Sequence, residues 1–204
     1  MKISIIKIII LITIFLNFFP TISFAEKRTY NIGILLEEIN TEVEPLLEKL
    51  KKEIKTVVGE DANIEFPAEL QIQTKNDFQK VRESYIKLVS EADLIIAFGV
   101  YNSTMVNQQV DHVKPTIVVD RFTSKVSGID KENKTSGKHN LTYVVFSNSF
   151  EKDFDQFKKI YDFKNVGIVV EKPLLEILDF NSMFSDVLSN ADSSFKIIPY
   201  ENSE

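Results

Sequence analysis

A turn that could bind an anion lies at residues 99–103, where Gly-Val-Tyr-Asn-Ser follows a short apolar run. Gly99 permits a sharp turn or a close approach of a ligand to the backbone. Asn102 or Ser103 could cap the following helix, whose free N–H groups attract a carboxylate or phosphate, and Tyr101 could stack on a ligand. The alternative interpretation is a plain helix cap with a packed tyrosine.

Other candidate binding residues follow the remaining expected strands, because open parallel sheets bind ligands outside the carboxyl ends of their strands. Arg121 could clamp a carboxylate through two hydrogen bonds, although a surface pair with Asp120 explains the same two residues. Glu37 and Glu38 could bind a cation or could form the exposed acidic start of a helix. The complete predicted ligand-binding set is Glu38, Asn40, Thr74, Gly99, Tyr101, Asn102, Ser103, Asp120, Arg121 and Asn148.

The sequence indicates neither catalysis nor a cofactor. It has no cysteine and only two histidines, which excludes a thiol nucleophile and a histidine-rich or cysteine-ligated metal site. No P-loop, dinucleotide-binding glycine pattern or G-x-S-x-G turn is present. His112, near a helix end, and His139, in a polar loop, are expected to face solvent. The net charge of −6 argues against nucleic acid as a partner.

The elements that must position these residues alternate between apolar runs and amphipathic segments, which predicts an α/β fold with a doubly wound parallel sheet. Thr41 is expected to cap the first helix, and Asn76 or Asp77 the second. A polar stretch at 124–140 is expected to be an exposed loop. The expected strands of this part are Tyr30–Leu36, Ile64–Gln73, Leu94–Phe98, Thr116–Val119 and Leu141–Phe146.

A second β-α-β unit begins near residue 165, where Asn-Val-Gly-Ile-Val-Val is similar in sequence to the opening strand, Tyr30–Leu36. We expect a helix over Leu174–Leu188 and a strand over Phe195–Pro199. The predicted domains are a signal peptide at 1–25, an N-terminal α/β lobe at 26–145 and a partial second α/β lobe at 146–204. By element count the second lobe is incomplete, short of the first by roughly two to three β-α units.

The N-terminus has the pattern of a cleaved signal peptide. Lys2 and Lys7 precede the run Ile8–Leu16, which is apolar apart from Thr13 and is followed by Pro20. Ser23-Phe24-Ala25 then offers small residues to a signal peptidase. The run is shorter than the ~20 apolar residues that cross a bilayer. Without a cysteine at the cleavage site, no lipid can be attached. The sequence therefore predicts a periplasmic protein that is not a lipoprotein.

Five stretches, in this order and spacing, are similar to the ABC-transporter substrate-binding-protein-like family, which has the type I periplasmic binding fold. This resemblance implies a non-enzymatic protein that captures a small molecule between two lobes. The stretch that comprises Ser136-Gly137 and Asn140–Tyr143 is most similar to a subgroup that accompanies outer-membrane efflux channels. The stretches are Asn31–Ile34, Ala92–Gly99, Lys114–Asp120, Ser136-Gly137 with Asn140–Tyr143, and Val166–Val170.

The leading hypothesis is a periplasmic solute-binding component of an ABC-type transport system, with a small organic ligand and an inner-membrane permease as partners. The alternative is a non-catalytic accessory protein of an outer-membrane or efflux assembly with the same fold. An exported hydrolase is disfavoured because no catalytic constellation is present, and a detached sensor ectodomain is a further possibility.

Overall fold

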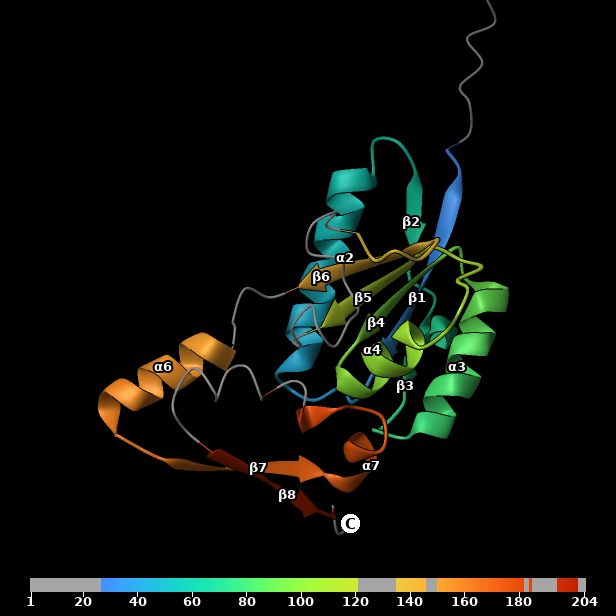
Figure 1. Ribbon diagram of the computed structural model, residues 1–204. Helices are drawn as coiled ribbons and strands as arrows, with labels where there is room; N and C mark the ends of the chain where they lie inside the picture. The colour runs from blue at the N-terminus through green and yellow to red at the C-terminus, as the bar shows by residue number, and fades with distance from the viewer. Residues whose placement is uncertain (1–26, 121–134, 146–149, 182–183, 185–193, 202–204) are drawn as a thin grey trace, which may run out of the picture.

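The computed structural model describes residues 27–120, 135–145, 150–181, 184 and 194–201, which form two lobes (Figure 1). We call the part that contains β1–β6 the first lobe and the part from α6 to β8 the second lobe. The predicted signal peptide lies outside the described residues. In the described part of the chain, every helix is too short or too polar to cross a lipid bilayer.

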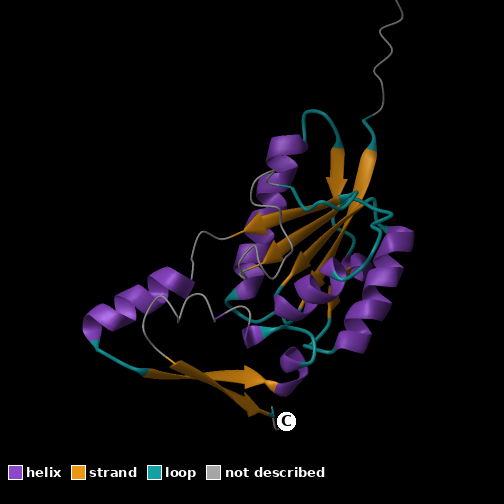
Figure 2. Cartoon of the chain, viewed as in Figure 1, coloured by secondary structure: helices purple, strands orange, loops and turns teal. Residues whose placement is uncertain are grey.

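The first lobe is built on a parallel sheet in the order β2-β1-β4-β5-β6, with β3 also paired to β1. This confirms the predicted α/β fold with a doubly wound parallel sheet. Figure 2 shows the strands as a twisted fan with helices on both faces. The strands are β1 (Thr29–Leu36), β2 (Asn63–Glu65), β3 (Gln71–Gln73), β4 (Leu94–Phe98), β5 (Thr116–Asp120) and β6 (Leu141–Val145).

Side chains of β1 alternate between the two faces of this sheet, as strand geometry requires. Ile34 and Leu36 pack with Leu47 of α2 (Val43–Val58) on one face. Leu35 packs on the other face with Leu88 of α3 (Phe78–Glu91) and Val106 of α4 (Val100–Asn107). Burial on both faces explains why the second half of β1, Ile32–Leu36, contains no polar side chain.

Two details of the predicted first lobe are wrong. The single strand expected over residues 64–73 is divided into β2, a 3-10 helix at Ala68–Leu70 and β3. Pro67 stands just before the helix, and proline has no N–H to donate to a continuous ladder. Thr41 does not cap α2; instead Asn40 Oδ1 accepts hydrogen bonds from the N–H groups of Glu42 and Val43. Asp77 caps α3 as expected, accepting from the N–H of Lys80.

The expectation of a solvent-exposed His112 is also wrong. Its side chain is only 2% exposed, and its Nδ1 lies 2.8 Å from the hydroxyl of Tyr85. The other ring nitrogen, Nε2, has no hydrogen-bond partner among the described residues. Burial is the main cause that lowers the pKa of His112, and the charge of Lys138 lowers it further. His139, by contrast, is exposed as expected.

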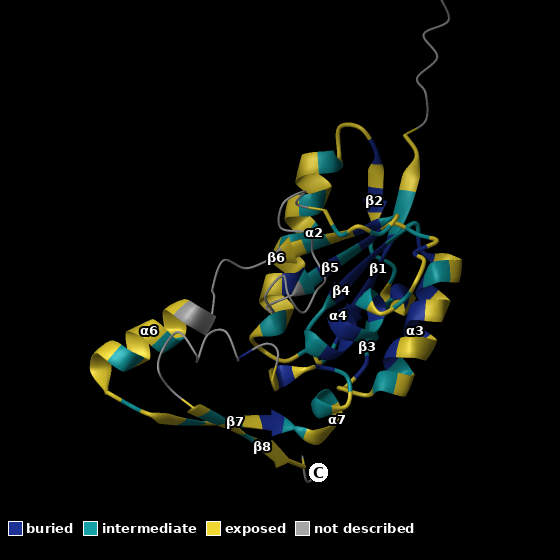
Figure 3. Ribbon diagram, viewed as in Figure 1, coloured by how far each residue is buried: buried dark blue, intermediate teal, exposed yellow. Residues whose placement is uncertain are grey.

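The second lobe contains α6 (Phe150–Ile160) and the parallel pair β7 (Asn165–Glu171) and β8 (Ser194–Tyr200). Its strands β7 and β8 are largely exposed or half-buried, whereas β1 and β4 at the centre of the first lobe are mostly buried (Figure 3). The helix expected over residues 174–188 is wrong as one element, because α7 spans only Lys172–Leu175; residues 182–183 and 185–188 of that range lie outside the described part of the chain. The chain then turns, which allows Leu178 and Phe180 to join the core of the lobe.

Candidate functional site

The carboxyl ends of β1 and β4 lie side by side at the edge of the sheet that faces the second lobe. Strands β2 and β3 follow β1 on one side, and β5 and β6 continue from β4 on the other. The direction of the chain across the sheet therefore reverses between β1 and β4. Open α/β sheets bind ligands at such a switch point, which makes this edge the candidate site.

Glu37 and Gly99, the residues that follow these two strands, are in direct contact. Gly99 has φ +93° and ψ +167°, a conformation essentially restricted to glycine. A Cβ atom built on Gly99 would lie 2.2 Å from Cδ of Glu37. Gly99 is therefore required both by its backbone conformation and by the space that the Glu37 carboxylate fills.

The carboxylate of Glu37 is bound at the N-terminus of α4. Its Oε1 accepts a hydrogen bond of 2.7 Å from the backbone N–H of Tyr101. The positive end of the helix dipole stabilises a negative group at this position. The sequence led us to expect an exposed acidic start of α2 or a cation site at Glu37 and Glu38, but Glu37 caps a different helix.

Three of the predicted binding residues are buried behind the strand ends. Thr74 donates a hydrogen bond of 2.8 Å to Oδ1 of Asn102, whose amide nitrogen donates to the carbonyl of Phe98. The hydroxyl of Ser103 donates to the carbonyl of Val119 over 3.3 Å. These bonds tie α4 to the ends of β4 and β5, so the three polar side chains hold the edge of the sheet in shape. Ligand contact by these residues stays a prediction.

A groove of about 580 Å³ runs between the start of α2 and the ends of β1, β4 and β5. Two carboxylic residues, Glu37 and Glu38, stand among otherwise mainly apolar walls. Leu46 is 68% exposed although it is large and apolar. We call this the switch-point groove; it is lined by Leu36, Glu37, Glu38, Val43, Leu46, Leu47, Leu50, Phe98, Gly99, Val100 and Val119.

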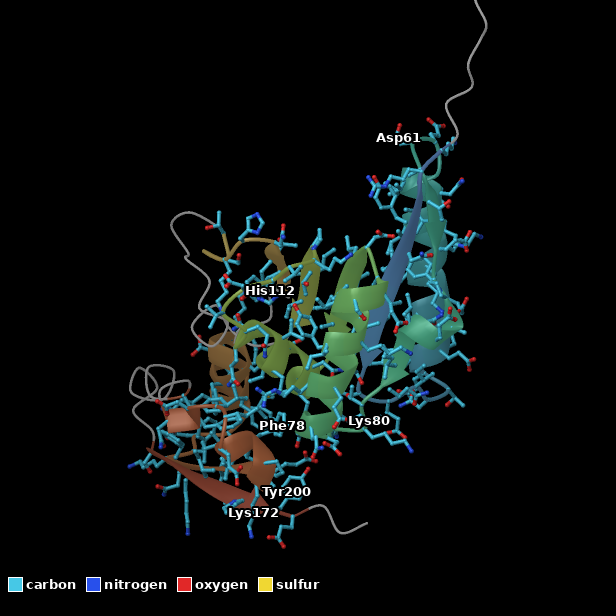
Figure 4. All side chains as sticks on the ribbon, turned by 90° about the vertical axis from the view of Figure 1, so that its right-hand side faces the viewer. Asp61, Phe78, Lys80, His112, Lys172 and Tyr200 are labelled. Atoms are coloured by element: carbon cyan, nitrogen blue, oxygen red, sulfur yellow. The ribbon has the colours of Figure 1, made fainter. Side chains whose placement is uncertain are left out.

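The two lobes meet through Tyr101 and Glu171. The hydroxyl of Tyr101 donates to one oxygen of the Glu171 carboxylate at the end of β7. Tyr200, at the end of β8, donates to the other oxygen over 2.9 Å. The ring of Tyr101 lies 4.6 Å from that of Phe78, and Figure 4 shows Phe78 on the end of the first lobe that faces Tyr200. Val100 of α4 packs against the core of the second lobe.

The environment of Tyr101 opposes its ionisation. Burial is the largest cause that raises the pKa of Tyr101, followed by its hydrogen bond to Glu171 and by the negative charges of Glu171 and Glu37. The Tyr101 hydroxyl therefore remains a hydrogen-bond donor between the lobes at neutral pH. This contact joins the carboxyl ends of strands from both lobes at one place.

The structure brings together only part of the predicted set. Glu38 and Gly99 line the groove, and Tyr101 lies between the lobes. Asn40 is used in the turn before α2. Asp120 ends β5 but its side chain lies outside the described residues, as do Arg121 and Asn148.

Glu37 and Glu171 follow expected strands but are not in the predicted ligand-binding set, although they make specific contacts in this region. Glu37 directly follows the first strand, and Gly99 directly follows the strand that pairs with it. Recognising that these two strands are neighbours would have indicated their contact. Glu171 similarly ends the first strand of the second lobe.

No protein-family model matches the sequence, and no curated protein matches it. Among solved structures, a leucine binding protein from Thermotoga maritima has a TM-score of 0.57 and 14% identity, with 87% of this chain and 50% of that chain covered. An ABC domain in complex with L-Trp from Streptococcus pneumonia has a TM-score of 0.57 and 17% identity, with 83% and 56% covered. A periplasmic binding protein type 1 from Bordetella pertussis has a TM-score of 0.57 and 14% identity, with 88% and 50% covered.

These likenesses confirm the predicted type I periplasmic binding fold, and several of the similar structures are solute- or substrate-binding proteins of ABC transporters. The chain spans about half the length of the solved structures it matches.

Proposed function

We propose that this protein is the solute-binding component of an ABC-type transport system and that it holds a small organic ligand between its two lobes. The observation that carries this proposal is the meeting of strand ends from both lobes. Tyr101 of the first lobe and Glu171 of the second join there by a hydrogen bond, beside the switch-point groove. Concave, mostly apolar sites with a few polar groups are typical of small-molecule binding.

The ligands of similar structures support a small organic molecule as the ligand class. Among these structures are solute binding proteins from Rhodopseudomonas palustris in complex with 3,4-dihydroxy benzoic acid and with benzoate. The predicted signal sequence supports a periplasmic location and an inner-membrane permease as the partner that receives the ligand. We also propose the lobe boundary at residues 145–146, between β6 and α6.

Thermal unfolding of the purified protein in the presence of solutes tests the proposal. The panel comprises amino acids, aromatic acids, sugars, nucleosides, amines and alcohols. A ligand at 100 times its Kd stabilises the folded state by about 2.7 kcal/mol, which raises the Tm of a chain of this size by about 5–10 °C. If no solute class raises the Tm, the proposed solute-binding function is wrong.

Two matched variants on α2 then locate the site. Leu46→Trp fills the switch-point groove with a larger ring, and we expect it to abolish the ligand-induced rise in Tm. Val57→Trp is the control, because Val57 lies on the same helix, is 77% exposed and does not line the groove. Equal ligand responses of the two variants would place the ligand elsewhere.

A further inference from the structure

The carboxylate of Glu37 occupies the N-terminus of α4, the position where an anionic group of a ligand could bind. Its Oε1 takes the N–H of Tyr101 at 2.7 Å, and its carboxylate fills the space above Gly99. We infer that Glu37 is a specificity-determining residue that keeps the anionic group of a ligand away from this helix end. The inference deepens the proposed solute-binding function and rests on it. A ligand of the switch-point groove therefore meets α4 with a group other than an anion.

The position of the Glu37 carboxylate is fixed from the backbone as well as from the side chain. Glu37 follows Leu36, which is buried at the end of β1. The carbonyl oxygen of Glu37 accepts a hydrogen bond of 2.7 Å from the N–H of Lys75, just beyond β3. The residue is thus held at the edge of the sheet while its side chain reaches α4. An incoming anion would have to displace a group that is anchored at both ends.

An anion at this position would be opposed for two reasons. The N–H of Tyr101, which points toward the site, already has the carboxylate as its acceptor. A second negative charge placed beside Glu37 would also meet like-charge repulsion, which suppresses the binding of wrong partners. Glu171 adds a further carboxylate on the far side of Tyr101, bonded to its hydroxyl. Both carboxylates disfavour negative charge around Tyr101.

Acetate is a suitable probe, because it is a carboxylate that needs no further recognition. The experiment follows the backbone amide of Tyr101 by ¹⁵N–¹H NMR while acetate is added at constant ionic strength. In the wild-type protein we expect no saturable shift. In Glu37→Ala the freed N–H should bind acetate, with an apparent Kd at least about tenfold lower than in the wild type, because the like charge has been removed. Glu38→Ala is the control, since Glu38 lines the groove without capping α4, and it should behave as the wild type.

Each other outcome overturns the inference. Saturable acetate binding at Tyr101 in the wild type would show that Glu37 does not exclude anions. No binding in Glu37→Ala would show that α4 does not receive an anion even when its N-terminus is free. Glu37→Ser is the second variant should the alanine variant not fold, and loss of folding in both would make the role of Glu37 structural. The thermal-shift panel is independent of this titration, so failure of the proposed function and failure of the inference are distinguishable.

Discussion

Replacement of Gly99 by alanine is expected to destabilise the protein by about 2.5–6 kcal/mol, the sum of two separate contributions. The φ of +93° and ψ of +167° at Gly99 lie where a residue with a Cβ is strained by about 1–3 kcal/mol. The added Cβ would also lie 2.2 Å from Cδ of Glu37, so that the carboxylate must leave α4. Loss of a hydrogen bond to a charged group costs about 1.5–3 kcal/mol.

Urea unfolding of the wild type and of Gly99→Ala measures this difference. Gly137→Ala is the matched control, because Gly137 also has a positive φ, of +67°, but a Cβ there would meet no atom within 4 Å. The control is expected to lose only about 1–2 kcal/mol from backbone strain. A loss in Gly99→Ala no larger than that in Gly137→Ala would refute the contact with Glu37.

A double-mutant cycle separates the two contributions of Gly99. Once Glu37→Ala has removed the carboxylate, Gly99→Ala should cost only the backbone strain, about 1–3 kcal/mol. The two substitutions together should therefore cost less than the sum of the single losses, as expected for residues in contact. Strict additivity would show that the two residues do not act on each other.

Three further predictions concern other described contacts. Thr74→Val should cost about 1–3 kcal/mol in urea unfolding, because Oδ1 of buried Asn102 loses its donor. The pKa of His112 is lower in the folded protein, so the unfolded chain binds a proton first as the pH falls below about 6.5. The free energy of unfolding should therefore decline below that pH. Unfolding measured at pH 5–8 should show a smaller decline for His112→Leu. Tyr101→Phe should speed amide hydrogen exchange at the end of β7 roughly tenfold, because Glu171 loses its donor from the first lobe.

Each of these has a matched control in the chain. Thr142→Val, on the exposed face of β6, should stay within about 0.5 kcal/mol of the wild type, and an equal loss in both threonine variants would contradict the role of Thr74. His139→Leu should keep the wild-type pH profile; if it removes the decline, the assignment to His112 is wrong. Tyr161→Phe, at a tyrosine that is exposed, should leave exchange in β7 unchanged.

The pattern of apolar residues predicted the fold class, because strands that are buried on both faces of a sheet consist largely of apolar residues. The run over residues 94–98 became β4, and the alternation of such runs with amphipathic helices gave a parallel sheet. The division of one expected strand at Pro67 was readable from proline chemistry but was not anticipated. The burial of His112 is not predictable from its neighbours in sequence, because its hydrogen-bond partner Tyr85 lies 27 residues away.

The candidate site was less predictable than the fold. Local spacing correctly selected Gly99 and Tyr101 as residues at the edge of the sheet. It did not indicate that the buried side chains of Thr74 and Asn102 bond to each other 28 residues apart. Nor could it show that Glu37 is the acceptor for the N–H of Tyr101, since those residues are 64 positions apart.

By itself, the sequence determined that most of the apolar runs form strands of a parallel sheet and which residue types follow those strands. These properties depend on periodicity and on local backbone chemistry, which neighbouring residues carry. Only the tertiary structure decided that the first strand lies beside β4, and therefore that the helix end at Gly99 receives the carboxylate of Glu37. The physical reason is that charge and hydrogen bonds act over a few ångströms, whichever parts of the chain the fold brings to that distance.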